Sequence, residues 1–420
     1  MAGELLRQVR VLDPLNGRDS CADVWLESDV VRDITEHITD VPEGTEVRDG
    51  TGLVLGPGLV DLYSHSGEPG NESRETMETL ARAAIAGGFT QLTLLPDTDP
   101  TVDSPTGITW ATSHWPATGP RLHLWGALTQ GVQGQQMTEL ADLAAAGAIG
   151  FADGQPLQNP LLLRRVLEYA HPLQKPVALW GCDRQLQGSG VAREGMDSIQ
   201  LGLPGTPALA ETTALATLLE CVATIGTPVH VMRVSTARSV ELIADAKQKG
   251  LPITASTTWL HLLLNTSDLK SYNPNLRVEP PLGTSADQMA LIQGVESGVI
   301  DAIAIDHAPY TYEEKTVAFA EAPPGVIGLE LALPLLWQGL VASEKWSALT
   351  LWKALSLSPQ TCLQQTPTGV TPGAPADLVL FDPSDRWRIT PQVLQSRSYN
   401  TPWLEQVITG RVIKTWTAPR

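Results

Sequence analysis

The residues best suited to chemistry in this chain are an imidazole and two carboxylates that follow short apolar segments. His65, Asp153 and Asp306 each lie within a few residues of the end of such a segment. Neutral imidazole and carboxylate bind divalent metals, and they also act as general acids and bases. Arg233 lies near the end of a similar segment, and its permanently protonated guanidinium repels a metal cation. The set therefore leaves two hypotheses open: a metal site, or a site in which a fixed cation replaces the metal.

The elements that must position these residues are alternating strands and helices in the middle of the chain. Eight apolar runs there have the length of buried parallel strands: 58–62, 90–95, 122–128, 148–151, 177–180, 229–234, 253–255 and 302–305. Segments with helical spacing lie between most of them, for example 72–86, 159–170, 211–225 and 239–250. This alternation predicts an α/β protein built on a (β/α)8 barrel, in which the residues just past the strands meet at the mouth.

The two ends of the chain are rich in short β-like runs separated by turn residues. These runs cover 9–12, 23–26 and 30–31 near the start, and 377–381 and 407–413 near the end. We therefore expect a small β-sandwich formed by both termini. The expected domains are 1–57 for its N-terminal half, 58–364 for the barrel and 365–420 for its C-terminal half.

The composition excludes several classes of function. With 28 basic and 46 acidic residues the chain has a net charge of −18, which disfavours nucleic acid or an anionic membrane as a partner. No secretory or membrane-spanning segment is evident, because the most apolar window, 325–342, is interrupted by Glu330, Pro334 and Gln338. Four scattered cysteines fit reduced thiols, so we expect a cytoplasmic protein.

Several local motifs occur in a fixed order along nearly the whole chain. They are GPGLVD at 56–61, GGFT at 87–90, DHAP at 306–309, GVIGLE at 325–330, PGAPADLV at 372–379 and NTP at 400–402. In this order they resemble dihydroorotase of the long bacterial type, a metal-dependent amidohydrolase. The resemblance implies two divalent metals at the barrel mouth, held by four histidines and two aspartates.

The metal ligands that the resemblance implies are largely replaced. Tyr63, Trp180 and Arg233 stand where the family pattern has histidines. Tryptophan cannot ligate and arginine is a cation. His65, Asp153 and Asp306 keep ligand types, Asp306 being also the family's general base. The sequence therefore favours no bound metal and a vestigial Asp306, and the alternative is a single zinc ion on His65, Asp153 and Asp306.

The substrate-binding pattern is also altered. Gly67, Asp97, Glu279 and Tyr310 stand where the resemblance implies arginine, asparagine, asparagine and histidine. A carboxylate at Asp97, about 5 Å from a substrate carboxylate, costs roughly 3 kcal/mol at an effective dielectric constant of about 20. His307 keeps the family pattern, and either contacts a substrate or only fixes the local backbone.

These departures lead to a structural hypothesis and a functional one. We expect Arg233 to pair with Asp306, because Asp153 and Asp306 would otherwise face each other without a neutralising charge. We also expect His65 to bond to Asp306. The functional hypothesis is a catalytically inactive, structural homologue of dihydroorotase in pyrimidine biosynthesis. By resemblance it would be a homo-oligomer that assembles with aspartate carbamoyltransferase.

Two alternatives stay open. One is an active dihydroorotase or other cyclic amidohydrolase that interconverts N-carbamoyl-aspartate and dihydroorotate with a single metal. The other is a sensor that binds a small molecule in the old pocket.

Overall fold

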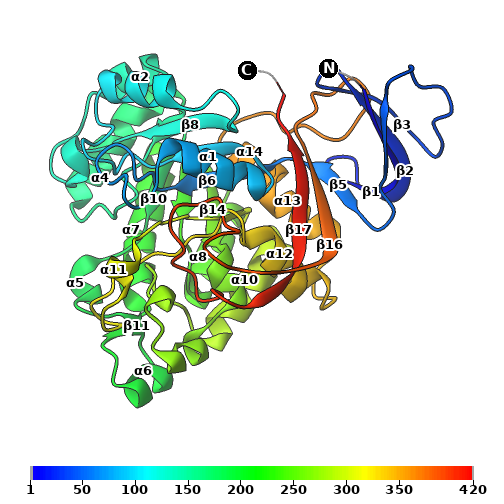
Figure 1. Ribbon diagram of the computed structural model, residues 1–420. Coiled ribbons are helices and arrows are strands. Elements are labelled where there is room, and N and C mark those ends of the chain that lie inside the picture. The colour runs from blue at the N-terminus through cyan, green and yellow to red at the C-terminus, as the bar shows by residue number, and fades with distance from the viewer. Residues whose placement is uncertain (1–2, 419–420) are drawn as a thin grey trace.

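The computed structural model describes residues 3–418, and its centre is a barrel of parallel strands surrounded by helices (Figure 1). Each strand lies beside the next in chain order. Within these residues the barrel strands are β6 (Leu59–Ser64), β7 (Phe89–Leu94), β8 (Arg121–Gly126), β9 (Gly150–Phe151), β10 (Val177–Trp180), β13 (Val229–Met232), β14 (Ile253–Thr258) and β15 (Ala302–Ala304). The predicted (β/α)8 class is confirmed.

The barrel closes between its first and last strands at the mouth. The amide of Asp306 donates to the carbonyl of Tyr63 at 3.1 Å, and the amide of His65 donates to the carbonyl of His307 at 2.9 Å. Because these bonds join β6 to the chain just after β15, they also fix the backbone of two candidate site residues.

Helices cover the outside of the barrel, and several of them present an apolar stripe to it. In α7, for example, Leu215, Leu218 and Val222 recur at helical spacing and are buried. Side-chain caps begin several helices; Asn159 accepts from the amide of Leu161 at the start of α4. The outer helices are α1 (Met77–Ala86), α2 (Pro105–His114), α3 (Leu140–Ala145), α4 (Pro160–Ala170), α7 (Leu209–Ile225), α8 (Ala237–Gln248), α10 (Ser285–Glu296), α13 (Ala348–Leu355) and α14 (Leu357–Cys362).

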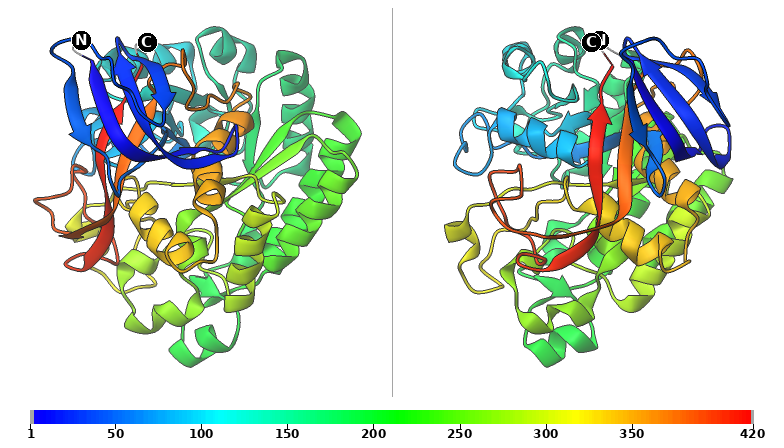
Figure 2. Two further views of the ribbon diagram at one scale, coloured as in Figure 1. Left: turned by 90° about the vertical axis from the view of Figure 1, so that its right-hand side faces the viewer. Right: turned by 45° about the vertical axis from the view of Figure 1, so that its right-hand side comes forward.

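Strands from both ends of the chain form a separate seven-stranded sheet beside the barrel (Figure 2). The two ends meet where β5 pairs antiparallel with β16, with Pro57 opposite Leu378. The sheet has an apolar core of its own, which includes Leu6, Val24 and Leu380. Its strands are β1 (Glu4–Asp13), β2 (Arg18–Glu27), β3 (Val30–Thr35), β4 (Glu46–Asp49), β5 (Val54–Pro57), β16 (Leu378–Arg388) and β17 (Val407–Trp416).

Short elements follow β10, β14 and β15; the apolar window 325–342 indicated α12 and η5, whereas most of the others are too short for a clear apolar pattern. They comprise α5 (Arg184–Gln187), β11 (Ala192–Arg193), α6 (Met196–Leu201), β12 (Gly205–Thr206), α9 (Trp259–Leu263), η3 (Thr266–Ser271), η4 (Pro274–Leu276), α11 (Tyr312–Lys315), α12 (Ala332–Leu336) and η5 (Trp337–Val341). None of the helices formed by residues 3–418 has both the length and the apolar character needed to cross a bilayer.

Candidate functional site

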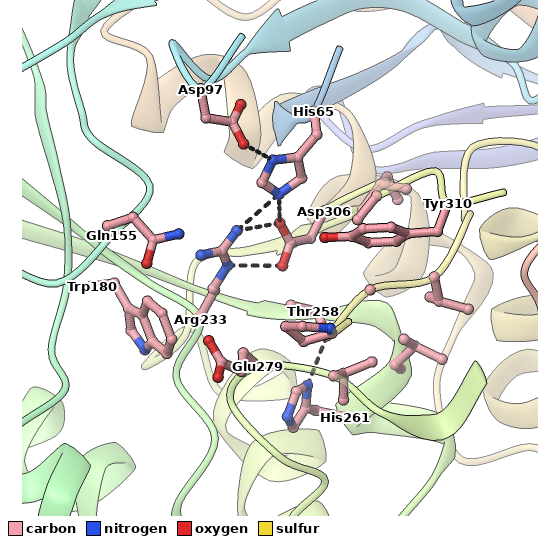
Figure 3. Close-up of a pocket in the computed structure, with 17 residues that line it drawn as sticks. His65, Asp97, Gln155, Trp180, Arg233, Thr258, His261, Glu279, Asp306 and Tyr310 are labelled. Carbon is pink, nitrogen blue, oxygen red and sulfur yellow. Dashed lines mark hydrogen bonds and ion pairs between the residues drawn. The ribbon is translucent and has the colours of Figure 1, made fainter. Parts of the chain in front are cut away.

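A cavity of about 120 Å³ lies at the mouth of the barrel (Figure 3). Its wall combines charged groups with aromatic and apolar ones, and its polar and aromatic lining residues include His65, Asp97, Gln155, Trp180, Arg233, Thr258, His261, Glu279, Asp306 and Tyr310. Because these residues come from the ends of different strands and the loops after them, the barrel alone brings them together.

Arg233 and Asp306 form a buried ion pair in this cavity. Arg233 Nε donates to Asp306 Oδ2 at 2.8 Å and Nη2 to Oδ1 at 2.6 Å, so the contact is bidentate. The remaining nitrogen, Nη1, donates to the carbonyl of Gly154 at 2.7 Å. The two side chains are only 5% and 14% exposed. The predicted pairing of Arg233 with Asp306 is confirmed.

The ion pair is held in an unusual backbone conformation. Both Arg233 (φ 55°) and Asp306 (φ 52°) lie in the left-handed region, which costs free energy for residues other than glycine. Burial alone would raise the pKa of Asp306, but Arg233 and then His65 lower it well below its usual range. Asp306 is therefore a stable anion with both oxygens engaged, which makes it a poor general base.

His65 contacts two carboxylates, of which only that of Asp306 was expected. Its Nδ1 is 2.5 Å from Asp97 Oδ2, and its Nε2 is 3.4 Å from Asp306 Oδ1. Burial would lower the pKa of His65, but Asp97 and Asp306 raise it to about 9. The imidazole is thus a cation at neutral pH. The expected contact with Asp306 exists, but Asp97 is the closer partner.

Together these residues form a four-residue cluster in which two cations balance two anions. It comprises His65, Asp97, Arg233 and Asp306, and we call it the charge cluster. His65 Nε2 and Arg233 Nη2 lie 3.2 Å apart beside the same Asp306 oxygen. Asp97 was expected to add an uncompensated negative charge, and this was wrong: it lies on the loop after β7, the neighbour of β6, and its carboxylate is paired with His65.

Aromatic side chains flank the guanidinium of Arg233. Its Cζ lies 5.2 Å from the ring centroid of Trp180 and 5.6 Å from that of Tyr63. The Tyr63 hydroxyl accepts from the amide of Arg233 at 3.1 Å and bonds with Ser256 Oγ at 3.0 Å. Tyr63 is fully buried, and this burial raises the pKa of its hydroxyl. The phenol therefore stays neutral and fixes the backbone of Arg233.

Asp153 does not join the cavity, contrary to the expectation that it faces Asp306. Its Oδ1 accepts from the amides of Leu128 and Thr129 at 2.8 and 3.0 Å, and its Oδ2 accepts from Thr129 Oγ1 at 2.5 Å. Burial raises the pKa of Asp153 to about 6, while these hydrogen bonds oppose the rise. The carboxylate ties the loop after β8 to the end of β9, and only the next residue, Gly154, contacts Arg233.

The two histidines near the remaining strand ends also have structural partners. His307 is 1% exposed and does not line the cavity; its Nδ1 accepts from the amide of Gly328 at 3.1 Å. His230 lies within β13, and its two ring nitrogens bond to the hydroxyls of Thr254 and Ser256, at 2.9 Å each. His307 therefore fixes the local backbone.

The positions that depart from the family's substrate pattern have new neighbours. Glu279 Oε2 accepts from Arg184 Nη1 at 3.0 Å, a partner that the sequence analysis missed because Arg184 belongs to a short excursion. The Tyr310 ring packs against two basic side chains: Arg74 Cζ lies 4.7 Å and Lys315 Nζ 5.3 Å from the ring centroid.

Gly67 lies in a tight backbone turn that leaves no room for a side chain. A Cβ atom there would lie 2.4 Å from the carbonyl oxygen of Glu75 and 2.6 Å from that of Asn71. An arginine at this position would require the loop to move.

Comparison with solved structures shows which proteins share this fold. L-hydantoinase from Arthrobacter aurescens aligns over 100% of this chain and 98% of its own, with a TM-score of 0.85 and 20% sequence identity. Dihydropyrimidinase from Brevibacillus agri aligns over 99% and 94%, with a TM-score of 0.82 and 20% identity. At these identities the likeness shows the fold alone.

Sequence relatives show the family to which the chain belongs. A family model described as Dihydro-orotase-like matches residues 52–239. A probable dihydroorotase-like protein from Synechocystis sp. is 44% identical over 436 residues, covering 97% of this chain and 98% of that protein. A dihydroorotase from Pelobacter propionicus is 36% identical over 418 residues, covering 99% and 98%. The chain belongs to the dihydroorotase-like family.

The family resemblance implies a metal at this mouth, and the side chains do not fit one. Within residues 3–418, no three His, Cys, Asp or Glu side chains are grouped as metal ligands would be. The one-zinc alternative needs Asp153, whose carboxylate is bound elsewhere. A metal beside Asp306 would also meet the guanidinium of Arg233, a permanent cation bound to both carboxylate oxygens.

Proposed function

We propose that this protein is a non-catalytic member of the dihydroorotase-like family, with Arg233 in the role of a fixed internal cation. The observation that carries this proposal is the bidentate contact of Arg233 with Asp306, in which both oxygens of the family's general base are used. The third nitrogen, Nη1, donates to the carbonyl of Gly154, so every guanidinium nitrogen already has a partner in the protein.

The chemistry of hydrolysis supports the same conclusion. Attack on a cyclic amide at neutral pH needs an activated water, and a bound metal lowers the pKa of water from about 16 to about 7. The charge cluster contains no open metal position and no free base, since His65 is protonated and Asp306 is paired. A water molecule in this cavity therefore keeps its ordinary, very weak nucleophilicity.

The cavity is also poorly suited to an anionic substrate. Dihydroorotate and N-carbamoyl-aspartate carry carboxylates, whereas the cavity wall already holds the carboxylates of Asp97, Glu279 and Asp306. The repulsion from Asp97 is smaller than the sequence alone suggested, because His65 neutralises it. In addition, the cations that could bind a substrate carboxylate are already in ion pairs: Arg233 pairs with Asp306, and Arg184 pairs with Glu279.

A combined assay tests this proposal. The protein is purified without chelators, its metal content is measured by mass spectrometry, and dihydroorotate formation and hydrolysis are followed with and without added zinc. We expect substoichiometric metal and no turnover above the uncatalysed rate, while a metal-dependent dihydroorotase assayed in parallel is active. Stoichiometric metal together with zinc-dependent turnover would overturn the proposal.

A structural role follows from a preserved fold with an inert centre. We propose that the protein acts as a cytoplasmic homo-oligomer that assembles with aspartate carbamoyltransferase, as the family resemblance implies for inactive homologues. Affinity capture of the native protein, followed by a carbamoyltransferase assay of the captured material, tests this. Carbamoyltransferase activity that stays entirely in the unbound fraction would refute the partnership.

A further inference from the structure

The connection between β16 and β17 leaves the terminal sheet and binds the barrel. In Figure 1 it is the dark red loop that extends from these two strands. Residues 394–402 of this connection make the contacts described below, and we call them the strap. The strap matters for the cavity because the barrel segments that it binds are also cavity walls.

The first half of the strap is held by two carboxylates of the barrel. Glu330 accepts from the amides of Gln395, at 2.9 and 3.0 Å, and Ser396, at 3.0 Å. Glu75 accepts from the amide of Arg397 at 2.9 Å and from the hydroxyl of Ser396. Three consecutive amides of the strap thus point at two carboxylates, which lie on either side of Ser396.

The second half of the strap binds the cavity wall itself. Asn400 Nδ2 donates to the carbonyls of Ala308 at 2.9 Å and Gly325 at 3.2 Å, and its Oδ1 accepts from the amide of Tyr310 at 3.1 Å. Its carbonyl accepts from the amide of Ile327 at 3.2 Å. Because Ala308, Tyr310 and Gly325 line the cavity, the position of Asn400 sets the position of that wall.

The two carboxylates differ in their access to solvent. Glu75 is fully buried and faces His307 Nε2 at 3.5 Å, next to the charge cluster. Glu330 borders a second cavity of about 250 Å³, beside Arg411 of β17. Lys414 also borders this cavity but is paired with Glu4 at 2.6 Å. Glu330 can therefore exchange protons with solvent.

We propose that the strap is a pH-sensitive closure of the cavity wall, which loosens when the carboxylates of Glu75 and Glu330 both carry a charge. Two anions beside Ser396 repel each other, and within the described chain Arg411 is the cation that faces Glu330. Neutral Glu330 removes the repulsion and still accepts hydrogen bonds from the amides.

The sign of the effect follows from the pKa of Glu330. Burial raises this pKa to about 7, the amides of Ser396 and Gln395 oppose the rise, and Glu75 adds to it. A carboxyl group whose pKa is raised by folding contributes stability below its unfolded pKa of about 4.3, and this is lost as the pH rises through the folded value. The strap is therefore held most tightly in mildly acidic solution and loosens above neutrality. The inference does not depend on whether the site is catalytic.

Hydrogen exchange of the intact protein tests the proposal. Protection factors of the amides of Gln395, Ser396 and Arg397 are measured at about pH 6 and about pH 8.5 and corrected for intrinsic exchange. We expect protection in the wild type to fall by up to about tenfold between these values. In Glu330→Gln, which cannot ionise, this fall is expected to disappear.

A matched control is available in the same connection. Glu405 lies outside the strap and its side chain is 61% exposed, so Glu405→Gln should behave as the wild type. Equal protection of the wild-type strap at both pH values would overturn the proposal. A fall in protection as large in Glu330→Gln as in the wild type would also overturn it. The wild-type series alone decides the first point, even if the variant folds poorly.

Discussion

Replacing Arg233 by methionine is the most direct test of the charge cluster. Methionine keeps a long unbranched side chain but removes the two hydrogen bonds to Asp306 and the one to Gly154. Asp306 would keep its negative charge in a site where its side chain is only 14% exposed. Breaking a buried ion pair in this way costs about 3–5 kcal/mol of unfolding free energy.

The assay is urea denaturation at neutral pH, followed by circular dichroism, with two further variants. In Arg233→Met with Asp306→Asn the isolated charge is gone, and asparagine tolerates the left-handed backbone found at this position. We expect the double variant to recover about 2 kcal/mol of the loss. Arg184→Met is the control, because Arg184 also contacts Trp180 but its side chain is 32% exposed. Its cost should be about 1 kcal/mol or less.

Two results would refute the reasoning about Arg233. One is a cost below about 1 kcal/mol for Arg233→Met, since a partner buried to this extent cannot be removed so cheaply. The other is a double variant that is as unstable as the single one, which would mean that the charge of Asp306 is not what Arg233 neutralises.

Three further substitutions probe the surroundings of the cluster. Asp97→Asn should lower the pKa of His65 from about 9 towards its ordinary value. Protonated His65 contributes its full stabilisation below about pH 6.5, and this is lost as the pH rises through about 9. The variant should therefore lose about 1–2 kcal/mol of unfolding free energy at pH 6 and little at pH 10. Imidazole NMR titration and denaturation at both pH values check this, and an unshifted His65 would contradict it. Tyr63→Phe removes the acceptor of a buried amide, and a cost of about 1–3 kcal/mol in urea denaturation is expected; a neutral effect would show that this bond is dispensable. Thr129→Val removes one donor to Asp153 and should cost about 1–3 kcal/mol without changing metal content, whereas a change in bound metal would revive Asp153 as a ligand.

Much of the fold can be predicted from the sequence because it depends on local patterns. The predicted run 177–180 coincides with β10 (Val177–Trp180), and the other seven barrel strands overlap their predicted runs. The terminal strands β4 and β5 escaped prediction for different reasons: three of the four residues of β4 are charged, and β5 ends in Gly56-Pro57, which is typical of a turn.

For the candidate site too, some features could be predicted from the sequence and others depended on the tertiary structure. Residue types alone predicted that Arg233 needs an anion such as Asp306, and that three of the histidines implied by the family pattern are replaced, at Tyr63, Trp180 and Arg233. Only the tertiary structure decided that Asp97 would neutralise His65, because the conformations of the loops after the neighbouring strands β6 and β7 bring the two side chains together. Likewise, only the path of the chain near its end decided that Glu330 would hold the strap. The physical reason is that charge requirements are properties of single side chains, whereas the choice of partner depends on which loops the fold brings within hydrogen-bonding distance.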